Sequence, residues 1–450
     1  MKHLFSSYWI RSAFYTILQR FSVTIFGLLN LAILARILPT SQYGAWGLFV
    51  AITTIFEQAK VNLLKNAHIR YVSSTEEKEE KTGIASASFL INASITILAI
   101  LLILAFGNWI SVVFHTGDDL AVMLKWFIPG LIIMVFFSHL EAIQQSFLDF
   151  KGVFAGYFIR QAVFFACVGG SLLLHLSYSL KMIVLYQSFG FLCGTIAIWF
   201  YSRPYLEYRF NPTVARIRQI LQYGKFILAS GVVSNLFTNL DQFITGKMMT
   251  SSVAAQYNIA LRINTVLDTP SYAAADILFP KSARASVAEG EGKVRYLFER
   301  MVGILLSLTV PIALFIILFP KFIIFVIAGN KYLAAAPILQ LYMVTRLMSP
   351  MQNQAANLLN SIGKQAVCFW MNLAALAVNL GVNYACVRNI GFYGAAIGST
   401  ISYSLTLVAW WFLMRHLIGF QPANILRYMR ETYITVYGFA RKLVVRGQQS

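Results

Sequence analysis

Long apolar runs, interrupted by short polar segments, repeat along almost the whole chain. Each run reaches about 20 residues, the length that a helix needs to cross the hydrocarbon core of a bilayer. The pattern therefore predicts about twelve transmembrane helices. They are expected at roughly 12–34, 43–64, 83–106, 121–146, 153–174, 181–202, 221–246, 254–279, 299–319, 336–359, 366–387 and 392–414.

The composition strengthens this prediction. Apolar residues make up 58% of the 450 positions, only 12% are charged, and the mean hydropathy is +0.66. A soluble protein carries roughly a quarter charged residues, and a single soluble core stops growing near 250–300 residues. We therefore predict an all-α integral membrane protein.

The distribution of basic residues predicts the orientation. Lys and Arg outnumber Asp and Glu by 36 to 17, but they lie in short loops between apolar runs, which argues against nucleic acid as the partner. With the N-terminus inside, 23 of the 36 fall in inner segments, 6 in outer segments and 7 within spans. Basic residues favour the cytoplasmic side, so both termini are expected in the cytoplasm.

A weak internal repeat divides the predicted helices into two halves. Shifted by 211 residues, the chain loosely matches itself; Asn30 then falls on Asp241, and Glu57 on Asp268. We expect two six-helix lobes in the same orientation around a central cavity, as in transporters with parallel repeats. The predicted domains are 1–206, 207–415 and a basic cytoplasmic tail at 416–450. The tail has apolar residues at helical spacing, so it either lies on anionic lipid headgroups or is solvated.

Three short motifs carry a family resemblance: LARILPTSQYGAW at 34–46, VAAQYN at 253–258 and NSIGK at 360–364. With the helix count and the repeat, they resemble the polysaccharide-biosynthesis flippases of the multidrug/oligosaccharidyl-lipid/polysaccharide exporter superfamily. The resemblance implies a transporter without cofactor or catalytic residues, in a bacterial inner membrane. It also implies alternating access and a polyprenyl-pyrophosphate-linked oligosaccharide, such as an O-antigen unit, as substrate. Membrane lipids and other glycan-assembly membrane proteins are the expected partners.

Polar residues at helical spacing within the spans predict a hydrated cavity. Guanidinium groups suit a pyrophosphate because their planar fork binds oxyanions. The expected phosphate ligands are Arg20, Arg262, Arg346 and Arg160. The expected polar or coupling residues of the cavity are Asp241, Asp268, Glu57, Asn235, Gln242, Asn258, Asn353 and Asn357.

The same residues have a structural alternative, because polar side chains often join transmembrane helices without any other role. In particular, Arg262 could pair with Asp241 or with Asp268. Lys60 and Lys125 are expected to extend toward a membrane interface.

Two other functions stay open. A multidrug or organic-cation exporter of the same superfamily would prefer acidic residues in its cavity. A membrane glycan polymerase or glycosyltransferase would need a catalytic loop or domain, but no predicted outer loop exceeds about 15 residues. Neither an ATP-binding motif nor a metal-ligand spacing of Cys and His is present in the sequence.

Overall fold

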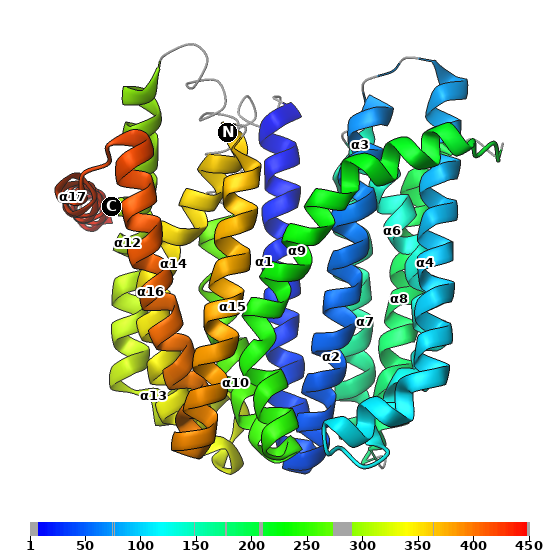
Figure 1. The fold of residues 1–450 in the computed structure, drawn as a ribbon, viewed down its shortest axis with the longest axis horizontal. Coiled ribbons are helices and arrows are strands. Elements are labelled where there is room, and N and C mark those ends of the chain that lie inside the picture. The colour runs from blue at the N-terminus through cyan, green and yellow to red at the C-terminus, as the bar shows by residue number, and fades with distance from the viewer. Residues whose placement is uncertain are drawn as a thin grey trace. The chain divides into compact units, whose positions relative to one another are not determined.

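The computed structural model describes residues 8–73, 75, 77–147, 149–175, 178–206, 210–272, 290–362 and 364–447, and every regular element among them is helical (Figure 1). The helices of the first part are α1 (Tyr8–Ile37), α2 (Thr40–Lys60), η2 (Val61–Lys65), α3 (Asn66–Ser73), α4 (Lys78–Val113), α5 (Asp119–Trp126), α6 (Ile128–Ser146), α7 (Lys151–Leu173), α8 (Leu180–Ser202), η3 (Arg203–Tyr205), α9 (Val214–Met248) and α10 (Ser251–Val266). Those of the second part are α12 (Glu291–Leu318), α13 (Pro320–Ala328), η4 (Asn330–Ala335), α14 (Ala336–Ser361), α15 (Gln365–Ile390), η5 (Gly391–Tyr393), α16 (Gly394–Ile418) and α17 (Pro422–Gly447).

The chain forms two compact units, each described here by itself. Unit 1 comprises Met1–Ile259 with Ile327–Lys331, and unit 2 comprises Ala260–Val326 with Tyr332–Ser450. The predicted parallel repeat and the domains 1–206, 207–415 and 416–450 stay predictions.

Several helices are long and apolar enough to cross a membrane. Within the described residues there are eight such segments, or nine if the two parts of α9, which bends by 41°, are counted as one span. One of the eight, Ala366–Ile418, contains both α15 and α16. The 26 residues of α14 are long enough, but its polar side chains keep it out of this set. The chain is thus a multi-pass membrane protein, and the count of twelve spans stays a prediction; residues 273–279 of the predicted span 254–279 lie outside the described residues.

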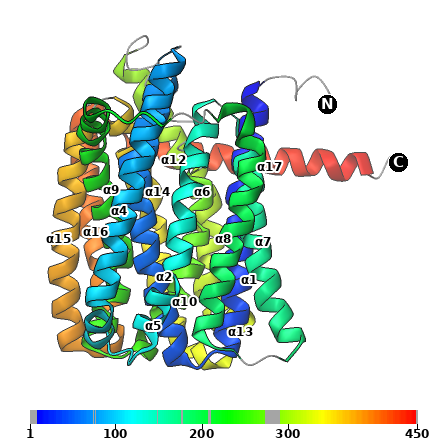
Figure 2. The same cartoon turned by 90° about the vertical axis from the view of Figure 1, so that its right-hand side faces the viewer.

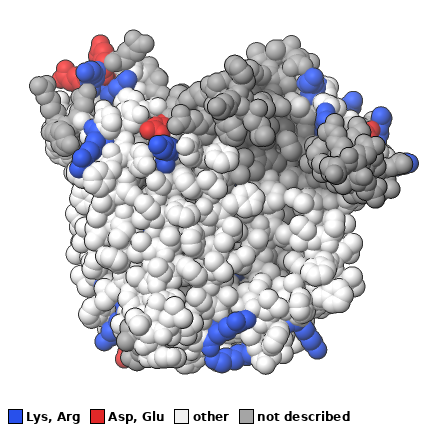
Figure 3. Space-filling view, turned by 180° about the vertical axis from the view of Figure 1, so that it is seen from behind, with Lys and Arg blue, Asp and Glu red and all other residues white. Residues whose placement is uncertain are grey.

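The surface agrees with this assignment. On α4, large apolar side chains such as Ile97, Leu101 and Leu104 are more than half exposed, as expected for a helix that faces lipid. Figure 3 shows, on the face drawn, Lys and Arg gathered near the ends of the helices, with a band almost free of charge between them. Lipid tails can cover such a band, whereas water could not do so favourably.

One predicted span is divided in the structure. The run 121–146 was expected to be a single helix, but α5 ends at Trp126 and α6 begins at Ile128. Pro129 explains the break, because it has no N–H to donate and fits best in the first turn of a new helix.

In unit 1, α9 packs closely on η2 through two glycines. A Cβ atom at Gly224 would collide with the carbonyl oxygen of Leu63, and one at Gly231 would collide with the amide of Asn62. Small residues allow such an approach between transmembrane helices. Substitution of Gly224 would therefore displace η2, a π-helical turn of the kind often found at functional sites, whereas a side chain at position 231 would displace the Asn62 amide.

The C-terminal helix α17 is attached to α12 within unit 2. The buried carboxylate of Glu299 accepts hydrogen bonds from the backbone N–H of Gln421 (2.7 Å) and from Asn424 Nδ2 (2.9 Å), and Phe298 packs edge-on against Phe420. In Figure 2, α17 extends across the direction of the long helices of its unit. The structure thus replaces the simple predicted tail with an anchored helix. Whether that helix contacts lipid headgroups stays open.

Candidate functional site

Unit 1 holds charged side chains from four elements within its apolar spans. We call Glu57, Lys60, Lys65, Glu141, Tyr157 and Arg160 the charged network. Glu57 and Lys60 come from α2, Lys65 from η2, Glu141 from α6, and Tyr157 and Arg160 from α7. Each lies in a segment able to cross a membrane, where an unpaired charge is costly.

Glu141 is the centre of the first part of the network. Its Oε1 lies 2.6 Å from Lys65 Nζ and 3.2 Å from Gln145 Nε2, and its Oε2 accepts a hydrogen bond from the Tyr157 hydroxyl at 3.2 Å. The carboxylate is buried, whereas Lys65 is partly exposed. Three donors on one buried carboxylate fix its position.

Arg160 is the centre of the second part. One of its terminal nitrogens lies 3.4 Å from Glu57 Oε1, and its guanidinium plane lies 3.9 Å from the centre of the Phe191 ring and 5.4 Å from that of Tyr157. The ion pair is long and both side chains are partly exposed. Arg160 therefore keeps donors that a further oxyanion could use. The tyrosine joins the two parts, because it contacts both Arg160 and Glu141.

Lys60 is placed differently from the prediction. We expected it to extend to a membrane interface, but it is buried, donates from Nζ to Thr96 Oγ1 at 3.0 Å, and lies 5.2 Å from the centre of the Phe56 ring. The prediction was wrong because the ammonium group finds a hydroxyl acceptor on α4 and the face of an aromatic ring within the span. With Lys65 and Arg160, it gives the network three cations against two carboxylates.

Unit 2 holds a separate buried pair. Arg346 on α14 donates from Nε to Asn264 Oδ1 at 2.6 Å and forms an ion pair with Asp268, which follows α10. Two of our predicted site residues, Arg346 and Asp268, are thus brought together. The arginine directs its nitrogens at protein partners in this arrangement.

Two further predicted residues join the helices of unit 1. Asn258 on α10 donates to Gln242 Oε1 on α9 at 3.0 Å and accepts from the Tyr43 hydroxyl on α2 at 3.3 Å. All three side chains are buried. The arrangement corresponds to the structural alternative, in which amides hold transmembrane helices together.

The other predicted residues are spread over both units. Arg20 and Asn235 are half-buried in unit 1, and the Asn235 amide donates to the carbonyl of Gly231 in its own helix. Asp241 is buried in unit 1, so a pairing with Arg262 of unit 2 stays a prediction. In unit 2, Arg262 and Asn357 are half-buried and Asn353 is exposed.

Sequence reasoning missed Glu141 and Tyr157. An acid inside the predicted span 121–146 was a usable signal, because a carboxylate in a span needs a cation nearby. The structure describes no group of three or more His, Cys, Asp or Glu that could hold a metal ion, in the residues that it covers.

In sequence, the chain is similar to known proteins of polysaccharide and glycan biosynthesis. The family described as "Polysaccharide biosynthesis protein" matches residues 33–337. The chain is 20% identical to the lipopolysaccharide biosynthesis protein WzxC of Escherichia coli over 94% of this chain and 85% of that protein. It is 22% identical to the probable low-salt glycan biosynthesis flippase Agl15 of Haloferax volcanii, over 87% of this chain and 81% of that one.

Solved structures share the fold. An inward-facing multidrug resistance transporter of the MATE family aligns with a TM-score of 0.77 at 14% identity, covering 90% of this chain and 98% of its own. The lipid II flippase MurJ, in an inward closed conformation, aligns with a TM-score of 0.76 at 15% identity, covering 95% and 92%. The family match spans more than half of the sequence, and the chain therefore belongs to the polysaccharide biosynthesis protein family.

Proposed function

We propose that this protein is a flippase that moves a polyprenyl-pyrophosphate-linked oligosaccharide from the inner to the outer leaflet of a bacterial inner membrane by alternating access. Family membership supports a role in glycan assembly, and a relative named as a glycan flippase supports the reaction. Both termini would be cytoplasmic, and other glycan-assembly membrane proteins would supply the substrate and take up the product.

The observation that carries this proposal is the net positive charge of the charged network. Three cations and two carboxylates lie at membrane depth, and Arg160, Lys65 and Glu57 are partly exposed. A pyrophosphate that enters the membrane loses its hydration, and fixed guanidinium and ammonium groups can replace it. Among the predicted phosphate ligands, Arg160 therefore ranks before Arg346, which is engaged by Asp268 and Asn264. Arg20 and Arg262 stay candidates.

The second candidate function is export of organic cations, which the fold shared with a multidrug transporter favours. A cation would be repelled by a network with an excess of cations, unless the acids were exposed and the bases neutralised. We therefore place this candidate second. A membrane glycan polymerase or glycosyltransferase is third, because the relatives named above point to transport rather than to bond formation.

The test replaces Arg160 in cells whose surface glycan depends on this protein. Arg160→Ala should reduce the surface glycan roughly tenfold or more, because it removes a charged hydrogen bond between the guanidinium group and the substrate phosphate. Arg160→Lys should cause a smaller loss, since it keeps the charge without the fork. The lipid-linked sugar should accumulate on the inner face.

Arg388→Ala is the control, because Arg388 is an exposed cation in the last turn of α15. The combined variant Arg160→Ala/Glu57→Gln separates loss of the site from the cost of leaving Glu57 unpaired. Normal flipping in both Arg160 variants would reject the network as the phosphate site, and Arg20 and Arg262 would be replaced next.

A further inference from the structure

Two histidines meet inside unit 1, beside Lys60 and Lys65 of the charged network. His68 on α3 and His139 on α6, here called the histidine pair, have ring centres 5.8 Å apart in an edge-to-face arrangement. His68 is completely enclosed, and the Phe89 ring lies 5.1 Å from that of His139. Enclosed imidazoles are uncommon without a hydrogen-bond partner, so the site calls for an explanation.

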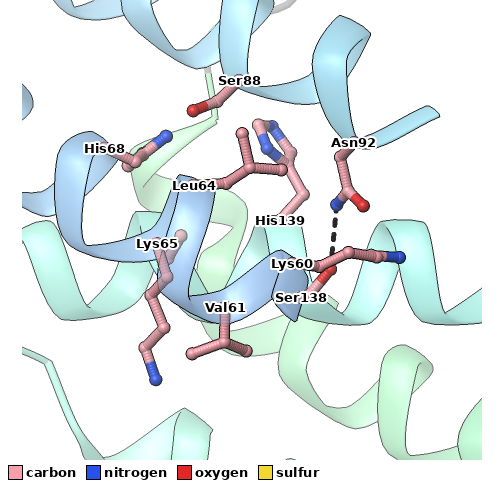
Figure 4. Close-up of a pocket in the computed structure, with 10 residues that line it drawn as sticks. Lys60, Val61, Leu64, Lys65, His68, Ser88, Asn92, Ser138 and His139 are labelled. Carbon is pink, nitrogen blue, oxygen red and sulfur yellow. Dashed lines mark hydrogen bonds between the residues drawn. The ribbon is translucent and has the colours of Figure 1, made fainter. Parts of the chain in front are cut away.

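A small cavity lies beside the pair (Figure 4). It leaves about 20 Å³ for the centre of a water molecule, which is room for one. Among the described residues that line it, both ring nitrogens of His68, Ser88 Oγ and Asn92 Oδ1 are buried without a hydrogen-bond partner. Asn92 Nδ2 is satisfied by Ser138 Oγ at 2.9 Å. A single water here would meet enough polar atoms to be held.

A second, larger cavity also borders the pair. It has a volume of about 380 Å³ and shares His68 and His139 with the first. Its lining also includes Lys81, Tyr205 and the exposed Phe210, so it extends to the surface of unit 1. The histidine pair therefore borders both this larger cavity and a water-sized space that Lys60 also lines.

The charges around the pair decide what it can bind. Lys60 from α2, Lys65 from η2 and Lys81 from α4 face the two cavities. The carboxylate of Glu141 on the same helix as His139 is already held by Lys65 and Tyr157. From α9, Tyr223 packs on Tyr71, and η3 contributes Tyr205. The described residues that line the two cavities include no carboxylate that could balance a new positive charge, so a charged ring is costly in this conformation.

We propose that the histidine pair is a proton-binding site whose occupancy drives the conformational cycle of unit 1. A hydronium ion in the larger cavity gives its proton to a ring nitrogen and becomes water, which leaves an imidazolium. Because that charge is stabilised only when water enters, proton binding favours a conformation with a more hydrated cavity. This inference deepens the proposed flippase function by naming its coupling ion. The role of the proton in transport rests on the proposed function, whereas proton binding itself does not.

The experiment measures hydration of the larger cavity in the full-length protein in lipid nanodiscs. The four native cysteines are replaced by alanine, and a spin label is attached at Ala85→Cys, which lines the cavity. Collision of the label with a water-soluble nickel complex is recorded from pH 8 to pH 4, a range that extends below the usual histidine transition because a charged ring is costly here. Accessibility should rise severalfold on acidification.

The variants His68→Gln and His139→Gln keep a polar side chain of similar size and should abolish this rise, singly or together. His175→Gln and His416→Gln, which change exposed histidines, should leave it intact. If a glutamine variant no longer elutes as a monodisperse peak in size-exclusion chromatography, the asparagine variant at the same position is used instead. An unchanged response in the double variant, or no response in the parent protein, overturns the proposal.

The assay needs no sugar substrate, so it separates the two proposals. A pH response that depends on the histidine pair, in a protein that fails to flip the lipid-linked sugar, would reject the proposed function and keep the proton site. Normal flipping with no pH response would reject the proton site and keep the proposed function.

Discussion

The buried charges of unit 2 are closed off, whereas those of unit 1 are linked to partly exposed groups. In unit 2, Arg346 and Asp268 are 8% and 10% exposed, and one cation faces one carboxylate. In unit 1, Glu57 is 23% and Lys65 20% exposed, and three cations share two carboxylates. Both sets lie among apolar helices and face the same desolvation cost.

The difference separates two uses of buried charge. A closed and balanced pair has little left to offer a ligand, because its donors and acceptors already face one another. A partly exposed network with an excess of one sign keeps unsatisfied capacity, which is a property of binding sites. We therefore expect substitutions in unit 2 to reduce stability, and substitutions in unit 1 to reduce transport more than stability.

The largest expected effect on stability concerns unit 2. Arg346→Ala leaves the Asp268 carboxylate buried without its cation, which should lower the free energy of unfolding by about 3–5 kcal/mol. Thermal unfolding of the purified protein in nanodiscs measures the change. Arg346→Met combined with Asp268→Asn should recover most of the loss, because no charge is then left unpaired. A single variant as stable as the parent protein would contradict the closed pair.

A smaller effect is expected when Lys65 is replaced in unit 1. Lys65→Ala leaves Glu141 with Gln145 and Tyr157 as donors, so the loss should be about 1.5–3 kcal/mol, the value of one hydrogen bond to a charged group. Flipping should fall more steeply than stability. Lys78→Ala, in an exposed position at the start of α4, is the control. If stability fell as much as in Arg346→Ala, the distinction between the units would fail.

The sequence predicted several of the helices and charged residues compared above, but it did not predict which charged residues pair. Apolar runs of about 20 residues located α1, α4, α7 and α8 well, because the bilayer imposes that length. Glu57 and Arg160 were both named as candidates, but 103 residues separate them, and helical periodicity gives a face without naming its neighbour. Asp268 was considered as a partner of Arg262, and the structure places it against Arg346, 78 residues away.

Other features could not be predicted from the sequence pattern, because they depend on local backbone geometry and on packing between distant helices. The π-helical turn η2 changes which way Lys65 points, and no residue spacing in the sequence marks such a turn. The histidine pair joins α3, which lies between the predicted spans 43–64 and 83–106, to α6, which the predicted span 121–146 merged with most of α5. Burial of single polar residues depends on packing with distant helices, which a single sequence does not specify.

The smallest expected effect concerns the uncharged bonds between α2, α9 and α10. Tyr43→Phe removes a hydroxyl that donates to Asn258 Oδ1 at 3.3 Å, while Asn258 keeps its bond to Gln242. The loss should be about 0.5–1.5 kcal/mol in unfolding free energy, because the bond is long and neutral. Flipping should be unchanged, and Tyr393→Phe at an exposed position should alter neither quantity. A strong loss of flipping in Tyr43→Phe at nearly normal stability would mean that these amides belong to the transport site, and that charge is the wrong criterion for separating binding from support.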